Sequence, residues 1–253
     1  MKLRYLSLLP LVLVAASAQA FDLGGLKEQL GNAVQGTTTQ PAANSAGLSG
    51  ISNADQVGSL KQALIQGAQT AVSNLAKENG YFGNDKVRIP LPDSLKQVDS
   101  LMRTVGMGKY ADELTLSMNR AAEAAVPEAK ALLIGAVKNM TVQDAKGILT
   151  GGNDAATQYF RKNTEAQLAG KFKPIVDKSM QKVKLAEKYD QFAGKGVQFG
   201  LVDQKDAKLD DYITRKALDG LFLMMAEQEK AIRANPLEAT GNLAKKVFSA
   251  IKF

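Results

Sequence analysis

The chain has 253 residues, 45% of them hydrophobic, and a formal net charge of +7. It contains no Cys, His or Trp, which excludes disulfides, Ser-His-Asp and Cys-His catalysis, and the usual zinc ligands. Any catalysis would have to use carboxylates, Lys, Tyr or a hydroxyl. The modest positive charge does not require nucleic acid, and we expect no cofactor, no metal and no nucleic-acid partner.

Residues 1–20 predict an export signal. Lys2 and Arg4 supply a basic start, residues 6–16 form an apolar run, and residues 18–20, AQA, form a small-x-small cleavage site. The apolar run is shorter than the roughly 20 residues that span a bilayer, and no later segment is long and apolar enough. We therefore expect a soluble periplasmic protein without a transmembrane segment or, for want of a Cys, a lipid anchor.

Residues 21–52 are expected to form an N-terminal arm and a linker. Residues 21–34 have the apolar spacing of a short amphipathic helix, which Gly24 and Gly25 weaken. This arm would either dock loosely or tether the protein to a membrane or partner. Residues 36–52 are rich in Gly, Thr, Ser and Ala and predict a flexible linker, so the folded domain is expected to cover residues 53–253.

Apolar residues at helical spacing recur through that domain. Helices are predicted from about Asn53 to a C-cap at Gly80, over 93–105 with Gly106 after it, over 110–125, from Pro127 to about Met140, and from a Thr141–Asp144 capping box to Leu149. Later helices are predicted after a cap at Asn153 or Asp154, on both sides of Pro174, over 185–193, over 210–235 with Asp210 or Asp211 as cap, and from Pro236 to about Ile251. Glycines at 194, 196 and 200 predict a loop.

The segment 81–92 interrupts this pattern. Two prolines and a Gly-Asn pair forbid a helix, and residues 87–91 are predicted to be extended. This stretch would form a short lone strand, pack Ile89 and Leu91 on the core, or rim a cleft. No alternating run exceeds a few residues, so the sequence predicts a single all-α, multi-helix globular domain.

Residues 210–234 predict the central helix of that domain. Its middle, Ala217–Ala226, carries one charge in ten residues, and its apolar side chains point in every direction, which is typical of a helix buried on most of its surface. The single charge is Asp219, and a buried carboxylate must be paired, hydrogen-bonded or protonated. Asp219 is therefore either a candidate catalytic acid or ligand anchor, or part of a structural ion pair or helix cap. Gly220 predicts a neighbouring backbone in close approach.

Asn119, Arg120 and Glu123 form a polar turn in an Ala-rich helix. Their spacing lets Arg120 pair with Glu123, although Arg120 could instead reach inward to Asp219. In the functional interpretation, Arg120 and Asn119 are candidate ligand-binding residues and Glu123 a candidate catalytic base. In the structural interpretation they form a buried network that fixes the helix register.

Two further stretches carry functional alternatives. Glycines at 151 and 152 precede a helix start, where free N–H groups can hold an anion; the pattern matches no nucleotide-binding motif, and the alternative is an ordinary capped turn. Arg161, on the same helix, is a candidate ligand-binding residue. Residues 171–195 hold seven Lys against three acids and would contact anionic lipid or form a solvated face.

Five segments resemble the DUF4197 family of exported bacterial proteins of unestablished function. They are GYFGNDKVRIPLPDSL (80–95), LTLSMNRAAEAAVPEAK (114–130), MTVQDAKGILTGGNDAATQYFR (140–161), FKPIVDKSM (172–180) and KALDGLFLMMAEQEKAIRANP (216–236). The resemblance implies a helical domain behind an export signal and assigns no catalytic residue.

Three functions remain open at this point. The first is a non-enzymatic module that binds a protein or small-ligand partner in the cell envelope, which the lack of His and Cys favours. The second is a hydrolase-like enzyme using Glu123 and Asp219, with Arg120 and Arg161 as electrostatic stabilisers. The third is a protein that makes weak contact with anionic lipid.

Overall fold

The computed structural model describes residues 53–183, 186, 189–190 and 208–235 of the chain. All of them belong to one unit, Asn44–Phe253. The predicted export signal, arm, linker, glycine loop and last helix lie outside the described residues, as does most of the helix predicted over 185–193. The described residues contain helices and no strand, which confirms the all-α class.

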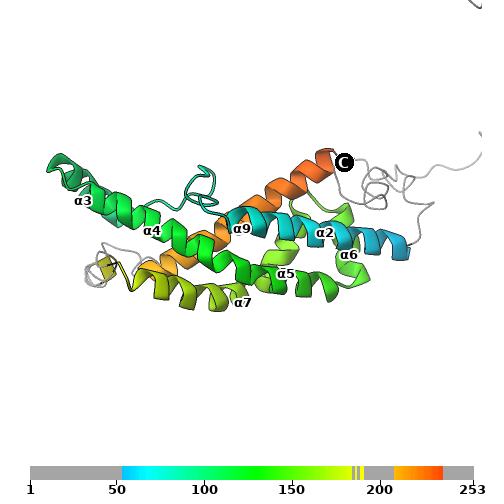
Figure 1. The fold of residues 1–253 in the computed structure, drawn as a ribbon. Coiled ribbons are helices and arrows are strands. Elements are labelled where there is room, and N and C mark those ends of the chain that lie inside the picture. The colour runs from blue at the N-terminus through cyan, green and yellow to red at the C-terminus, as the bar shows by residue number, and fades with distance from the viewer. Residues whose placement is uncertain (1–52, 184–185, 187–188, 191–207, 236–253) are drawn as a thin grey trace, which may run out of the picture. The chain divides into compact units, whose positions relative to one another are not determined.

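Most of the helices are joined by turns of a few residues, with longer stretches at 76–92 and 181–208 (Figure 1). They are α2 (Asn53–Leu75), α3 (Asp93–Thr104), α4 (Lys109–Ala125), the 3-10 helix η1 (Val126–Glu128), α5 (Ala129–Lys138), α6 (Val142–Thr150), α7 (Ala155–Met180) and α9 (Leu209–Ala234). The main core lies between α2, α4, α5, α7 and α9, and a smaller apolar cluster joins α2 to α6 and the start of α7.

Helix α9 is the central helix that the sequence predicts. It packs against α7 over most of its length and also contacts α2 and α4. Leu221 and Phe222 in its middle are fully buried. Most of its middle is covered, as predicted, but the neighbouring helices leave one stripe open, and the expectation that Asp219 is buried is wrong. Leu223 is exposed there, and the Asp219 side chain, one turn earlier, is 47% exposed.

Helix α2 ends at Leu75, five residues before the predicted glycine cap. The turn that follows contains Asn79 in the left-handed region, with a φ of 64°, which Asn tolerates better than most residues. Gly80 is needed for a different reason: a Cβ atom there would lie 2.4 Å from the Leu75 carbonyl oxygen. The glycine permits a tight turn and does not cap the helix.

Pro174 does not divide two helices, contrary to the prediction. It lies inside α7, which runs unbroken for 26 residues. A proline inside a helix costs about 3 kcal/mol because it removes one N–H and crowds a carbonyl. Phe172 and Val176 on either side are fully buried in the main core, and this packing offsets the loss of a single backbone hydrogen bond.

The start of α9 is held by a residue that the sequence does not single out. Neither Asp210 nor Asp211 caps it; both pair with Lys173 of α7. The N–H group of Leu209 instead donates to Asp190 Oδ1 at 2.8 Å. Lys173 belongs to the Lys-rich stretch 171–195, so at least one Lys of that stretch pairs with acids of the protein itself.

The capping box before α6 is confirmed in both directions. Asp144 N donates to Thr141 Oγ1 at 3.1 Å, and Thr141 N donates to Asp144 Oδ2 at 3.0 Å. The pKa of Asp144 is lowered, chiefly by the Thr141 hydroxyl and then by the Thr141 backbone N–H, because both donors favour the ionised carboxylate.

Candidate functional site

Asn119, Arg120 and Glu123 lie on α4 and face the segment that follows α2. Arg120 Nη1 lies 2.5 Å from Glu123 Oε2, which confirms the predicted pair. The other oxygen, Glu123 Oε1, accepts hydrogen bonds from the backbone N–H groups of Tyr81 and Phe82 at 3.0 and 3.1 Å. The Glu123 side chain is 5% exposed, and one cation and two amides compensate its burial.

The second amino group of Arg120 donates hydrogen bonds to the turn after α2. Nη2 donates to Asn79 Oδ1 at 2.9 Å and to Glu78 Oε1 at 3.1 Å. Among the described residues it makes no contact with Asp219, so the alternative in which Arg120 reaches inward to Asp219 is wrong. Arg120 and Glu123 together fasten this turn to α4.

Asn119 fastens the extended segment in a similar way. Its Oδ1 accepts from Ile89 N at 2.8 Å and its Nδ2 donates to Ile89 O at 2.9 Å, so one side chain replaces a neighbouring strand for one residue. Ile89 is buried, and Leu91 packs against the core. Residues 86–90 also border a surface hollow of about 160 Å³, so the segment both packs on the core and rims a small cleft.

Gly220 lies under two side chains of this segment. The sequence had predicted a neighbouring backbone in close approach, and that prediction is wrong. A Cβ atom at 220 would lie 2.8 Å from the Tyr81 ring and 3.2 Å from Val87 Cβ. The Tyr81 hydroxyl donates to the Ala217 carbonyl at 2.6 Å. Burial, and secondarily the Glu123 carboxylate, raises the pKa of Tyr81 above its usual value, so the phenol stays a neutral donor.

Asp219 and Arg161 form a separate pair at the surface. Arg161 Nη1 lies 3.3 Å from Asp219 Oδ1 and 2.8 Å from Glu165 Oε1. The guanidinium carbon also lies 4.6 Å from the centre of the Phe222 ring, a cation–π distance. The structure therefore pairs Arg120 with Glu123 and Arg161 with Asp219 as two separate groups. Asn119 belongs to neither pair and binds the Ile89 backbone instead.

The glycine-rich start of α7 holds an anion that the protein itself supplies. Asp154 occupies the cap position without a side-chain cap. Glu229 of α9 takes its place: Oε1 accepts from Ala156 N at 2.9 Å, and Oε2 accepts from Thr157 N and Oγ1 at 2.9 and 3.0 Å. The free N–H groups and the helix dipole favour a negative charge here, so the predicted anion site is filled from within.

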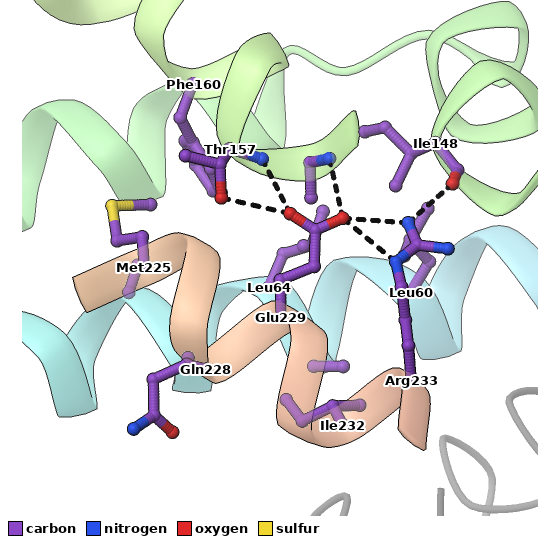
Figure 2. Close-up of a pocket in the computed structure, with 14 residues that line it drawn as sticks. Leu60, Leu64, Ile148, Thr157, Phe160, Met225, Gln228, Glu229, Ile232 and Arg233 are labelled. Atoms are coloured by element: carbon purple, nitrogen blue, oxygen red, sulfur yellow. Dashed lines mark hydrogen bonds and ion pairs between the residues drawn. The ribbon is translucent and has the colours of Figure 1, made fainter. Parts of the chain in front are cut away.

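Arg233, one turn beyond Glu229, pairs with it, and we call Glu229 and Arg233 together the clamp. Its Nη2 and Nε donate to Glu229 Oε1 at 2.8 and 3.0 Å, and Nη2 also donates to the Ile148 carbonyl at 2.8 Å. The Arg233 and Glu229 side chains are 3% and 9% exposed. The pair thus ties α9 to the start of α7 and to α6 (Figure 2).

An apolar pocket opens beside this clamp, between α2, α6, α7 and α9 (Figure 2). Its cavity volume is about 40 Å³. The wall is formed mainly by aliphatic, aromatic and small side chains: Leu60, Ala63, Leu64, Gly67, Ala68, Ile148, Ala156, Phe160, Met225 and Ile232, with Thr157, Gln228, Glu229 and Arg233 completing it. Because both Glu229 oxygens already accept hydrogen bonds, the pocket is suited to hold an apolar group and offers no free base.

Sequence reasoning did not single out Glu229 and Arg233. Their i, i+4 spacing in AEQEKAIRAN has the pattern of a solvated surface pair. The only local signal is Ile232, an apolar residue beside Arg233 in a charged stretch. The partner backbone lies more than seventy residues away, at Ala156 and Thr157, and no local pattern indicates it.

The described ranges contain neither a candidate metal site nor a candidate membrane-spanning helix. No group of three or more His, Cys, Asp or Glu residues there could hold a metal ion. The helices of the same ranges include none long and apolar enough to cross a membrane.

The fold and the site define an all-α protein whose central helix is clamped to its neighbours by a buried Glu–Arg pair beside an apolar pocket. The chain belongs to the family described as "Protein of unknown function (DUF4197)", which matches residues 50–249, and the family resemblance is thereby confirmed. Comparison with curated proteins and with solved structures gives no match.

Proposed function

We propose that the protein is an exported binding module that receives an apolar group of a protein or small-ligand partner in the cell envelope. The observation that carries the proposal is the apolar pocket next to the buried Glu229–Arg233 clamp. A pocket with a largely preformed apolar wall and a few fixed polar groups is the usual form of a small binding site.

The rigidity of the wall supports this function. Glu229 and Arg233 hold three of the four helices that line the pocket, so little ordering would be needed on binding, and ordering is a main cost of association. A volume of about 40 Å³ lies well below the roughly 300–1,000 Å³ of pockets that enclose a whole small molecule. The pocket therefore suits the tip of an alkyl chain or a single side chain, and the rest of the partner would lie outside.

Gly67 offers a direct test. A Cβ atom at this position meets no atom within 4 Å, and Gly67 borders the pocket, so Gly67→Leu should fill the opening without strain. The test is a titration with 1-hexanol, followed through the methyl resonances of Ile148 and Met225 by NMR. We expect these signals to shift in the wild type and the apparent affinity to fall at least tenfold in Gly67→Leu.

Gly58→Leu is the matched control. Gly58 lies on the same helix, is also free of atoms within 4 Å of a Cβ, and is exposed. Both substitutions remove a helix glycine and should preserve or raise stability. Equal hexanol binding by the two variants, or no response in the wild type, would contradict the proposal.

The export step has its own test. When the full-length chain is expressed in a Gram-negative host, cell fractionation should recover a processed product that begins at Phe21 in the periplasm. A chain expressed without residues 1–20 should stay in the cytoplasm. Recovery of an unprocessed full-length chain in the cytoplasm would remove the envelope from the proposal.

Contact with anionic lipid is a second candidate, and the tip between α3 and α4 favours it. Val105, Met107 and Tyr110 are exposed there, and Lys109 Nζ lies 5.2 Å from the centre of the Tyr110 ring. Exposed apolar and aromatic side chains beside a cation suit a membrane interface.

The lipid test is flotation with anionic phosphatidylglycerol vesicles at low and high salt. We expect the double variant Val105→Ser, Met107→Ser to reduce flotation. Val142→Ser, another exposed Val away from the tip, should leave flotation unchanged. Flotation that is absent at low salt, or the same in all proteins, would remove this candidate.

A further inference from the structure

Another cavity, larger than the apolar pocket, lies between α5, the start of α6 and α7, and its chemistry differs from that of the apolar pocket. Its volume is about 400 Å³, within the roughly 300–1,000 Å³ typical of small-molecule sites. Three side-chain amides line it, those of Asn139, Asn163 and Gln167. We call this cavity the amide groove.

The amides of the groove have hydrogen-bonding capacity to spare. Asn163 Nδ2 donates to the Tyr159 carbonyl at 2.7 Å, which leaves its Oδ1 as an acceptor. Asn139 and Gln167 are exposed and engage no other side chain among the described contacts. Each of these two amides can donate and accept at the same time.

The floor of the groove is small and partly apolar. Gly135 and Ala136 of α5 line it, and a Cβ atom at Gly135 would meet no atom within 4 Å. Tyr159 stands beside them, with its hydroxyl donating to the Ala136 carbonyl at 2.9 Å, so its ring is fixed in orientation. The floor therefore leaves space for a methyl group next to an aromatic wall.

The charge of the groove argues against an anionic ligand. Among the described residues that line it there is no Lys or Arg, and the one carboxylate is Asp144, whose Oδ2 is held by Thr141. A phosphate or other anion would meet no cation in this wall. A neutral ligand with hydroxyl and amide groups would meet donors, acceptors and a small apolar surface.

We propose that the amide groove binds a neutral saccharide with N-acetylated sugar units. The acetamido group would exchange hydrogen bonds with Asn139 and Gln167, since amides pair donor to acceptor in both directions. Its methyl group would rest on Gly135 and Ala136. Sugar hydroxyls would donate to Asn163 Oδ1 and to the remaining oxygen of Asp144. This site is independent of the apolar pocket and does not rest on the function proposed for it.

The probes are chitotriose, which carries acetamido groups, and maltotriose, which carries hydroxyls only. Binding is followed by the side-chain NH₂ signals of the ¹⁵N-labelled protein. We expect chitotriose to shift the signals of Asn139, Asn163 and Gln167 and to bind at least fivefold more tightly than maltotriose. Equal binding of the two sugars, or no binding of either, would overturn the proposal.

Two variants and two controls locate the site. Gly135→Leu, which fills the floor, should reduce chitotriose affinity at least tenfold, and Gln167→Ala, at an exposed position that the fold does not depend on, should reduce it several-fold. Gly147→Leu, on α6 and also without a neighbour within 4 Å of a Cβ, should bind as the wild type does. Gly67→Leu should also bind normally, which separates this site from the apolar pocket. Chitotriose binding that neither Gly135→Leu nor Gln167→Ala weakens would show that the sugar binds elsewhere and would overturn the assignment.

Discussion

Two buried carboxylates, Glu123 and Glu229, perform the same task in two regions of the molecule. Each accepts two backbone N–H groups from a distant segment, and each pairs with an Arg on its own helix. The two regions differ in the Arg. Arg120 is 34% exposed, so its cation remains in partial contact with water, whereas Arg233 is 3% exposed and borders the apolar pocket.

This difference shows how one type of contact can serve two purposes. Glu123 closes a turn that packs on the core, and both of its oxygens are engaged by the protein itself. Glu229 secures the wall of a pocket that stays open. A buried Glu paired with an Arg therefore indicates a function only when the residues around the pair are known.

The largest effect is expected from Glu229→Ala. It removes the Glu229 carboxylate from the buried Arg233 and from two N–H groups of α7 whose hydrogen bonds it accepts. Breaking a buried pair in this way costs about 3–5 kcal/mol, measurable as a lower urea midpoint at unchanged slope. Glu229→Gln keeps an acceptor for the N–H groups and should fall between the variant and the wild type. A loss below about 1 kcal/mol would mean that the clamp is not a major source of stability.

Glu123→Ala should have a smaller effect, about 2–3 kcal/mol, mainly from two backbone donors left unsatisfied. Arg120 can turn to water and keep its bonds to Glu78 and Asn79, so no charge is stranded. A double-mutant cycle with Arg120→Ala measures the pair itself. A loss as large as that of Glu229→Ala would contradict the contrast between the two regions.

Thr141→Ala should cost about 1 kcal/mol at pH 7 through loss of the α6 cap. The Asp144 pKa is lowered in the folded state, so its contribution is present above the unfolded pKa of about 3.9 and is lost as pH falls through the folded value. The stability difference between wild type and variant should therefore shrink between pH 7 and pH 3. Thr150→Ala is the control, because the Thr150 hydroxyl donates to the Lys146 carbonyl in the same helix and touches no carboxylate. It should show no such pH dependence.

The smallest effect is expected from Asp219→Asn, within about 0.5 kcal/mol of the wild type in the same unfolding experiment. The carboxylate is half exposed, and Arg161 keeps Glu165 as a partner. A loss above about 1 kcal/mol would restore the original expectation of a buried, structurally required Asp219.

Local features of the fold are readable from the sequence, and long-range ones are not. The capping box at Thr141 and the Arg120–Glu123 pair depend on residues three apart, so their spacing alone indicates them. Composition placed α9 among its neighbours but did not reveal which stripe they leave uncovered, and Asp219 lies on that stripe. The Glu229 clamp joins residues 72 and 73 positions apart, and only the packed structure brings them together.

The Glu229 cap also has a consequence for the order of folding. The first turn of α7 is completed by a side chain that follows it by more than seventy residues, so local interactions alone cannot finish this helix. Closing such a long loop has to precede the contact that stabilises it. We therefore expect the N–H groups of Ala156 and Thr157 to gain protection from solvent exchange only when α9 docks on α7.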